Sequence, residues 1–168
     1  MKHFGELEAA KRQDEILPAL QLLEPRLQRL SLVPLSAEPV IHGDIGLPRL
    51  VPIPFMGEGM RRVLSIVLAI ANAPSGVVLI DEVENGLHYS VMRDVWKAIA
   101  EAARRADVQV FATTHSYECI VAAHEAFTVS GPYDLRLFRL DRTGEEIKVA
   151  AYDQDVLGYS AEMNHEVR

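Results

Sequence analysis

The chain has 168 residues, enough to bury one hydrophobic core, and its formal net charge is −7. Hydrophobic residues make up 49% and charged residues 24%, which is the balance of an ordinary folded globular protein. This acidic balance argues against a surface that binds nucleic acid over most of its area, because phosphate binding needs clustered lysine and arginine.

The first third of the chain predicts helical pieces followed by short edge strands. Leucine and isoleucine recur at helical spacing over residues 7–30, and Pro18 and Pro25 divide this pattern into two pieces. Pro25 suits the first turn of the second piece, since proline is tolerated there. Residues 31–56 combine frequent proline with alternating β-branched residues, which favours short strands and turns.

Strands and helices then alternate, which is typical of a parallel sheet. The predicted elements are a helix over 59–72, a strand over 77–81, a helix over 89–105, a strand over 108–113 and a helix over 117–126. The first of these strands is apolar throughout, as expected when helices cover both faces of a sheet. The segments LRLFRL and EIKVAAY, joined by DRTGE, predict a C-terminal β-hairpin. We therefore predict an α/β fold, with a mostly parallel sheet flanked by helices.

No internal repeat or low-complexity tract divides the chain, so we predict a single domain over residues 1–168. Its predicted parts are helical pieces and edge strands over 1–56, a central core over 57–130, and the hairpin and tail over 131–168. Cys119 is the single cysteine, which excludes an internal disulfide and fits a reducing compartment. The longest apolar run is far shorter than the roughly 20 residues of a membrane-spanning helix, so we predict a cytoplasmic protein without membrane contact.

Two adjacent acids follow the buried strand in the segment GVVLIDEVENGLH, residues 76–88. Asp81 and Glu82 would lie at the carboxyl edge of the sheet, where α/β proteins place their ligands. Desolvating two acids is costly unless a cation compensates, and Mg²⁺ prefers sparse carboxylate ligation plus phosphate oxygens. Asp81 could hold such an ion, and Glu82 could deprotonate an attacking water. Alternatively, the strand merely ends in solvated acids.

Two further motifs flank this strand. Gly57 and Gly59 open an apolar helix in FMGEGMRRVLSIVLAI, and free backbone N–H groups at a helix start can bind an anion. Arg61 and Arg62 in its first turns are either solvated or in contact with phosphate or DNA. His115 follows the next strand in FATTHSYE, where an imidazole can hydrogen-bond a phosphate oxygen. Alone, either motif is also compatible with a purely structural role.

The order and spacing of the three motifs resemble the C-terminal lobe of an ABC-type ATPase head. More narrowly, the chain resembles the AAA-15/AAA-21 and OLD-like ATPases found beside nucleases in phage-defence systems, which are relatives of the RecF and SMC heads. In this resemblance VVLIDE corresponds to the Walker B strand, with Asp81 on Mg²⁺ and Glu82 as the catalytic base. TTHS corresponds to the switch region, which makes His115 the sensor of the γ-phosphate.

The resemblance also implies nucleotide contacts from two loops. MGEGM resembles the signature loop, where Gly57 replaces the usual serine, Gly59 is the invariant glycine and Glu58 lies between them. ENGLH resembles the D-loop, with Asn85 near its start and His88 where transporters commonly have aspartate. The closing segment AEMNHEVR is similar to the usual end of the family. ABC heads act as dimers, so the signature loop would serve the ATP site of a neighbouring subunit.

The phosphate-binding half of such a head is absent from this sequence. A P-loop needs Gly-Lys followed by serine or threonine. No lysine here follows a glycine; the four lysines are Lys2, Lys11, Lys97 and Lys148. We therefore predict that the isolated chain hydrolyses ATP negligibly, and that ATP and Mg²⁺ bind only in a completed assembly. The P-loop would be supplied by a partner, which is a P-loop-bearing ATPase lobe or a homologous ATPase subunit, or by a missing N-terminal part of a longer protein. A homo-oligomer is a further possibility, as are a nuclease or DNA reached through the complex.

Two other functions compete with a partial ATPase in phage defence or DNA maintenance. The chain could be a catalytically inactive interaction or dimerisation module that keeps the fold of the lobe. Intact acids and histidine count against this alternative. A metal-dependent nuclease could use Asp81, Glu82, Glu84, His88 and His115, but these residues are too few and too strand-bound for a two-metal acid cluster. The DEVE string is also similar to DExx helicases, which carry their own P-loop upstream.

Overall fold

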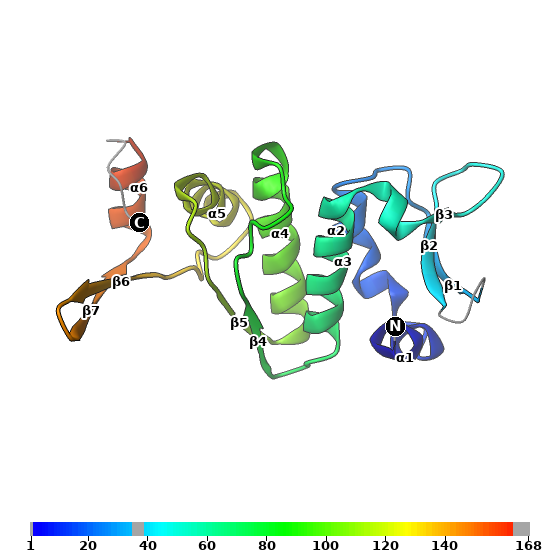
Figure 1. Cartoon of the computed structure of the whole chain (residues 1–168), viewed down its shortest axis with the longest axis horizontal. Coiled ribbons are helices and arrows are strands. Elements are labelled where there is room, and N and C mark those ends of the chain that lie inside the picture. Colours follow the sequence, from blue (N-terminus) through cyan, green and yellow to red (C-terminus); the bar gives the residue numbers. More distant parts are fainter. Residues whose placement is uncertain (1, 35–38, 163–168) are drawn as a thin grey trace.

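The structure is a computed structural model of the chain and describes residues 2–34 and 39–162. Its elements lie in a row (Figure 1). A small antiparallel sheet and helix α1 (Lys2–Ala9) form one end, three neighbouring helices form the middle, and a hairpin with helix α6 (Gln154–Glu162) forms the other end. Residues 163–168, which include most of the segment AEMNHEVR, lie outside the described residues.

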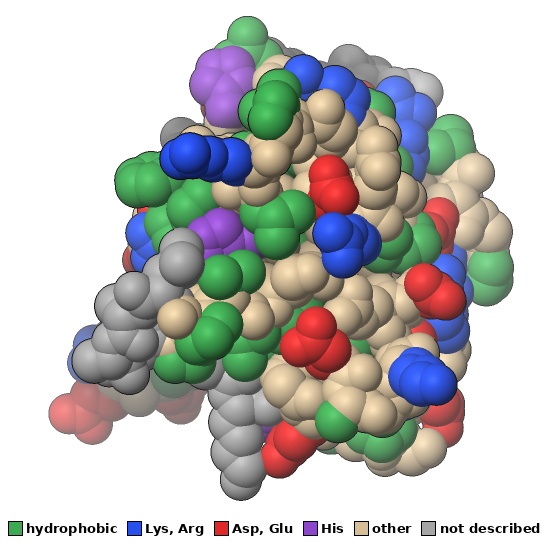
Figure 2. All heavy atoms as spheres, turned by 90° about the vertical axis from the view of Figure 1, so that its right-hand side faces the viewer, with side chains coloured by type: hydrophobic (Ala, Val, Ile, Leu, Met, Phe, Trp, Pro, Cys, Tyr) green, Lys and Arg blue, Asp and Glu red, His purple; other side chains and the backbone are tan. Residues whose placement is uncertain are grey.

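The N-terminal part consists of short helices and a three-stranded antiparallel sheet. The helical elements are α1 Lys2–Ala9, the 3₁₀ helix η1 Gln13–Glu15 and α2 Leu17–Gln21. The strands are β1 Arg29–Val33, β2 Val40–Asp44 and β3 Val51–Pro52, in the order β1-β2-β3. On the outer face of this end, acidic, basic and apolar side chains are interspersed, without a field of one sign (Figure 2).

The second helical piece predicted after Pro25 is wrong. Residues after Pro25 form a turn, in which the Leu27 N–H donates to the Glu24 carbonyl at 3.0 Å, and β1 follows. Leu30 is buried and pairs with Gly43 of β2. Because leucines three residues apart can be buried by a turn and strand as well as by a helix, pairing with β2 overrides the helical pattern. Pro18 lies in the first turn of α2, where proline is tolerated.

The centre of the molecule follows the prediction closely. After the 3₁₀ helix η2 Ile53–Met56, the chain forms α3 Glu58–Ala71, β4 Val77–Ile80, α4 Tyr89–Ala106, β5 Gln109–Ala112 and α5 Tyr117–Val129. Helix α4 packs between α3 and α5 (Figure 1). Its buried residues join those of α3 and of the N-terminal elements in one continuous core. This core fixes the strand ends relative to the start of α3.

The predicted mostly parallel sheet is wrong for the described residues. Strands β4 and β5 form one parallel pair, whereas the other two sheets are antiparallel. In β4, Val78 and Ile80 are buried, but Val77 is 56% exposed and Leu79 is 77% exposed. Helices of this chain therefore cover one face of the pair. No contact within the described residues covers the apolar side chains on the other face.

The C-terminal hairpin is confirmed. Strands β6 Leu137–Thr143 and β7 Glu146–Tyr152 pair along their whole length, and α6 Gln154–Glu162 follows. Gly144 at the turn has φ +66°, a conformation that glycine adopts without strain. A small apolar cluster centred on Ile120 and Leu157 joins this end to α5. Among the described residues, no helix is both long enough and apolar enough to cross a membrane.

Candidate functional site

The two strands of the parallel pair end side by side. Ile80 is opposite Ala112, so Asp81 and Thr113 follow at the same carboxyl edge. The Thr113 hydroxyl donates a 2.6 Å hydrogen bond to Asp81 Oδ1 and accepts one of 2.9 Å from the Glu82 N–H. The Val83 N–H donates to the Thr113 carbonyl at 3.0 Å. The two acids are therefore held to the next strand by one threonine.

Glu82 has an unusual backbone conformation. Its φ is +45°, in the left-handed region that side chains other than glycine rarely adopt. The Glu82 carbonyl accepts from the Asn85 N–H at 2.9 Å, which closes a tight turn. Arg62 Nη2 donates to the carbonyls of Asp81 at 2.6 Å and of Glu82 at 2.8 Å. Such a conformation persists only where surrounding contacts determine it.

The loop after β5 is tied to the loop after β4 through Glu84. Glu84 Oε1 accepts a 2.9 Å hydrogen bond from the His115 N–H. Partial burial opposes ionisation of Glu84, but hydrogen bonds from its own backbone and from His115 outweigh burial and lower its pKa from the usual 4.5. Its other oxygen, Oε2, is buried without a hydrogen-bond partner. The His115 side chain itself is exposed.

The glycine loop, residues 57–59, lies in contact with the loop after the two acids, residues 85–88. Gly57 has φ +99° immediately before α3, a conformation that requires glycine. A Cβ on Gly86 would lie 2.7 Å from Cγ of Glu58, and one on Gly59 would lie 3.5 Å from Leu87. The start of α3 and residues 85–88 therefore form one continuous surface.

His88 has a structural role in this surface. It is the N-cap of α4, where its Nδ1 accepts a hydrogen bond from the Ser90 N–H at 3.4 Å. Its ring also stacks at an angle on Tyr89, with 4.3 Å between the ring centroids. Near it, Glu58 forms an exposed ion pair with Arg61 at 3.1 Å.

The predicted residues thus fall into two neighbouring groups. Asp81, Glu82 and the loop carrying His115 lie at the carboxyl edge of β4 and β5. The second group consists of Gly57, Glu58 and Gly59 at the start of α3, next to the loop that carries Asn85 and His88, whose Gly86 and Leu87 approach Glu58 and Gly59. Within the described residues, no cluster of three or more acids, histidines and cysteines could hold a metal ion by itself.

The sequence does not predict the contacts of three residues at this site. Thr113 lies in the TTHS segment, and the pairing of β4 with β5 could have placed it beside Asp81. The sequence indicates Glu84 only as a candidate nuclease acid, whereas its carboxylate accepts a hydrogen bond from the His115 N–H in the loop after β5. The sequence predicts that Arg62 is either solvated or in contact with phosphate or DNA, whereas it donates to backbone carbonyls in the structure. No local signal in the sequence indicates this contact.

Comparisons with known proteins connect this arrangement to a family. Residues 2–120 match AAA_21, described as "AAA domain, putative AbiEii toxin, Type IV TA system". A Helicobacter pylori protein named ATP/GTP phosphatase is 41% identical over 73 residues, which are 42% of this chain and 20% of that protein. An uncharacterised protein of Methanocaldococcus jannaschii, MJECL11, is 34% identical over 92 residues, 55% of this chain and 80% of that protein. The aligned part is thus a fifth of the Helicobacter relative.

Solved structures agree on the fold. A chain solved in work on ATP-driven dimerization and DNA-stimulated activation of SMC ATPases has a TM-score of 0.62 at 14% identity, with 99% of both chains covered. An SMC head bound to the C-winged helix domain of ScpA has a TM-score of 0.57 at 17% identity, over 84% of this chain and 42% of that one. The chain therefore belongs to the AAA_21 family, and it has the mixed α/β fold of an SMC-like ATPase head, of which it corresponds to the C-terminal lobe.

Proposed function

We propose that the chain is the signature, Walker B and switch half of a composite ABC-type ATPase, which hydrolyses ATP only when a P-loop lobe completes it. The observation that carries this proposal is the strand-end cluster. Thr113 bonds both Asp81 and Glu82, and Glu84 bonds the loop of His115, so two polar segments meet at one edge of a sheet. Ligands of α/β proteins bind at this edge.

Mg²⁺ is implied by the family, and the residues of this edge fit it. Mg²⁺ in phosphoryl-transfer sites is held by one or two carboxylates, with phosphates and waters as the other ligands. Asp81 is exposed at a strand end, and its hydrogen bond to Thr113 occupies one of its two carboxylate oxygens. We propose Asp81 as the protein ligand of the ion on this chain. When bound, the ion would neutralise charge on the phosphates.

The other residues take roles that their positions support. Glu82 lies exposed next to Asp81, where its carboxylate could accept a proton from an attacking water. His115, exposed after β5, could donate a hydrogen bond to a γ-phosphate oxygen. Gly57, Glu58 and Gly59 at the free N-terminus of α3 would approach a nucleotide held by a second subunit. Asn85 and His88 would border the same contact, since their loop packs against the start of α3.

The missing phosphate cradle would come from a partner or from an N-terminal part of the same protein that lies outside this sequence. In P-loop enzymes backbone amides and a lysine hold the β- and γ-phosphates. Lys97 pairs with Asp94 on α4, and Lys148 lies on the hairpin, so neither lysine is placed to hold these phosphates. We therefore expect the isolated chain to bind ATP weakly and to lack turnover.

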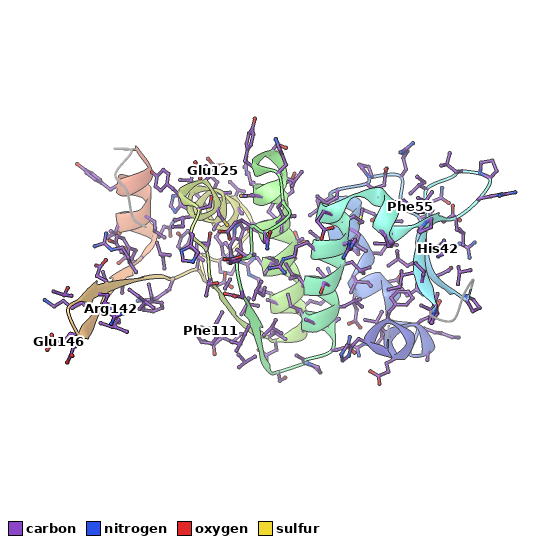
Figure 3. The ribbon with its side chains drawn as sticks, in the orientation of Figure 1. His42, Phe55, Phe111, Glu125, Arg142 and Glu146 are labelled. Atoms are coloured by element: carbon purple, nitrogen blue, oxygen red, sulfur yellow. The ribbon has the colours of Figure 1, made fainter. Side chains whose placement is uncertain are left out.

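An exposed apolar surface supports the presence of a covering lobe. Val77 and Leu79 of β4 and Phe111 of β5 are each more than half exposed, and Phe111 points away from the helices (Figure 3). The hairpin adds a second face of this kind, because register places its exposed apolar residues on one side: Phe138, Leu140, Ile147 and Val149. Exposed apolar patches of this extent mark interaction sites. A P-loop lobe that extends the β4–β5 sheet would cover both.

We also propose that the assembly acts in the cytoplasm. Cys119 is a free, buried thiol, which is compatible with a reducing compartment such as the cytoplasm. A homologous ATPase subunit could approach through the start of α3, while DNA or a nuclease could act through the completed complex. Phage defence or DNA maintenance is the process that we associate with such an assembly.

The experiment is a binding and turnover assay of this chain with an added P-loop-bearing ATPase lobe. We expect association that strengthens with ATP and Mg²⁺, and ATP hydrolysis that Glu82→Gln abolishes while association remains. Glu101→Gln on the exposed side of α4 is the matched control. Association that is indifferent to ATP would support an inactive interaction module instead. Turnover by the purified chain alone, abolished by Glu82→Gln, would show that no partner is needed.

A second set of variants tests the covering surface. Leu79→Ser and Phe111→Ser should abolish association with the P-loop lobe, because each removes apolar area from the proposed interface. Leu47→Ser, at an exposed leucine of the β2–β3 loop, is the control and should bind normally. Equal binding by all three variants would exclude this face as the docking surface.

A further inference from the structure

Arg62 is committed to the backbone of the two acids. Its Nη2 donates to the Asp81 carbonyl at 2.6 Å and to the Glu82 carbonyl at 2.8 Å. The side chain is half-buried, and its Nε is buried without a hydrogen-bond partner. Hydrogen bonds from a charged donor are about twice as strong as those between neutral groups. The guanidinium is therefore held against the turn at Asp81 and Glu82 by these hydrogen bonds and does not extend freely into solvent.

The two carbonyls that Arg62 holds belong to the peptide groups on either side of the Glu82 Cα. Fixing both peptide planes fixes φ and ψ of Glu82, and these angles decide where its side chain leaves the backbone. Glu82 has φ +45°, a left-handed conformation that is unfavourable for an L-residue relative to the right-handed region. The Asn85 N–H reaches the Glu82 carbonyl as well, but Arg62 alone contacts both carbonyls among the bonds of the described residues.

The other end of this connection is the start of α3. Arg62 lies in the second turn of α3, which begins at Glu58 directly after the left-handed Gly57. The helix is rigid at this point because its inward side chains, Met60, Val63 and Leu64, are buried in the core. A displacement of the glycine loop would therefore move the helix and Arg62 together. The contact between Glu58 and Gly86 adds a second connection to the same turn.

We propose that Arg62 is a positioning residue that sets the orientation of Glu82 and makes it depend on the position of α3. This inference rests on the proposed function of Glu82 as a general base and adds the group that holds it. A subunit that closes on the glycine loop would thereby change the geometry of Glu82. We do not expect Arg62 itself to contact the nucleotide or the attacking water.

The first test uses the chain alone and needs no turnover. In Arg62→Met, amide hydrogen exchange over residues 81–85 should become about tenfold faster, since two charge-assisted bonds are lost. Arg93→Met, at an exposed arginine on α4, is the control and should leave that exchange unchanged. Arg62→Lys keeps a donor and should recover part of the protection. The same exchange rate in Arg62→Met as in the control would overturn the proposal.

The second test uses the completed assembly with its P-loop lobe. Arg62→Met should lower kcat for ATP about tenfold or more, with KM and ATP-dependent association within about twofold of the wild type. Arg62→Lys should restore part of kcat, which separates positioning from a general loss of structure. An unchanged kcat would overturn the proposal. If the wild-type assembly shows no turnover, the proposed function fails, and the exchange experiment alone decides whether Arg62 holds the turn.

Discussion

The Thr113 hydroxyl donates to Asp81 Oδ1 at 2.6 Å while it accepts from the N–H of the residue that follows Asp81. A hydroxyl can do both because it has one donor and two lone pairs. The contact joins the ends of β4 and β5 one residue beyond the last pair of the ladder. It also restricts the rotamer of Asp81 and so orients this carboxylate at the edge of the sheet.

Thr113→Val should therefore lower the free energy of unfolding and free the Asp81 side chain from its hydrogen bond. The substitution keeps the shape of the side chain but removes a donor and an acceptor, which is worth about 0.5–1.5 kcal/mol in the free energy of unfolding. Urea denaturation of the two proteins measures this difference. Thr113→Ser keeps the hydroxyl and should stay closer to the wild type. A stable Thr113→Val together with a destabilised Thr113→Ser would show that the methyl group, and not the hydrogen bonds, matters.

Glu84→Gln should change how stability depends on pH. Despite partial burial, backbone hydrogen bonds lower the pKa of Glu84 below the usual 4.5, so the ionised form is favoured in the folded state. Its contribution is present above about pH 4.5 and is lost as the pH falls through the folded-state pKa. The wild type should therefore exceed Glu84→Gln in the free energy of unfolding near pH 7, and the gap should narrow in acid.

Chemical denaturation at several pH values between about 3 and 7 measures this gap. Other acids with lowered pKa values, such as Glu24 and Asp134, also lose stabilisation in acid, so only the difference between the two proteins is informative. Glu101→Gln serves as the control for removing one exposed negative charge. A gap that is constant with pH would mean that the carboxylate charge of Glu84 does not contribute.

Much of the central fold could be predicted from the sequence. The predicted helix 59–72 corresponds to α3 Glu58–Ala71, and 89–105 corresponds to α4 Tyr89–Ala106. Apolar periodicity and flanking glycines determine these elements locally. The carboxyl edge of the strands also followed from chain order alone, because adjacent parallel strands place their ends together. Hence the sequence could indicate Asp81, Glu82 and the loop that carries His115 as neighbours.

The remaining features depend on contacts that the sequence does not encode locally. The apolar run of β4 indicated helices on both faces, yet Val77 and Leu79 have no cover within the described chain. A strand has the same pattern whether its second face is covered by its own chain or by another one. The leucines after Pro25 likewise fitted a helix and a turn equally well. The contact of Arg62 joins residues 19 and 20 positions apart, which no local pattern specifies.

Gly86→Ala should strain the junction between the glycine loop and the turn after the acids. Gly86 has φ +77°, and a new Cβ would lie 2.7 Å from Cγ of Glu58. The left-handed conformation alone costs alanine roughly 1–2 kcal/mol, and Glu58 would have to move aside. We expect a lower melting temperature. Adding Glu58→Ala removes the Cγ atom and should relieve the steric part but not the backbone part, so full recovery would contradict this explanation.

Arg104→Lys should loosen the connection between the core and the hairpin. Arg104 donates to the carbonyls of Ser130 and Pro132, both at 2.7 Å, and forms two bonds to the Asp134 carboxylate at 2.6 and 2.9 Å. Its guanidinium also lies 5.5 Å from the ring centroid of Phe127. Lysine cannot reproduce this fork, so we expect a loss of about 1–2 kcal/mol, moderated by partial exposure.

Two measurements distinguish the loss of the Arg104 hydrogen bonds from a simple effect of charge. Limited proteolysis within residues 130–136 should be faster in Arg104→Lys, whereas Arg93→Lys should behave as the wild type. The hydrogen bond from Arg104 lowers the pKa of Asp134 below the usual 3.8, so the substitution should raise that pKa towards this value in an NMR titration. If proteolysis accelerates while the pKa of Asp134 stays lowered, the carbonyl bonds and not the carboxylate pair hold the loop. If neither changes, Arg104 does not clamp the hairpin to the core.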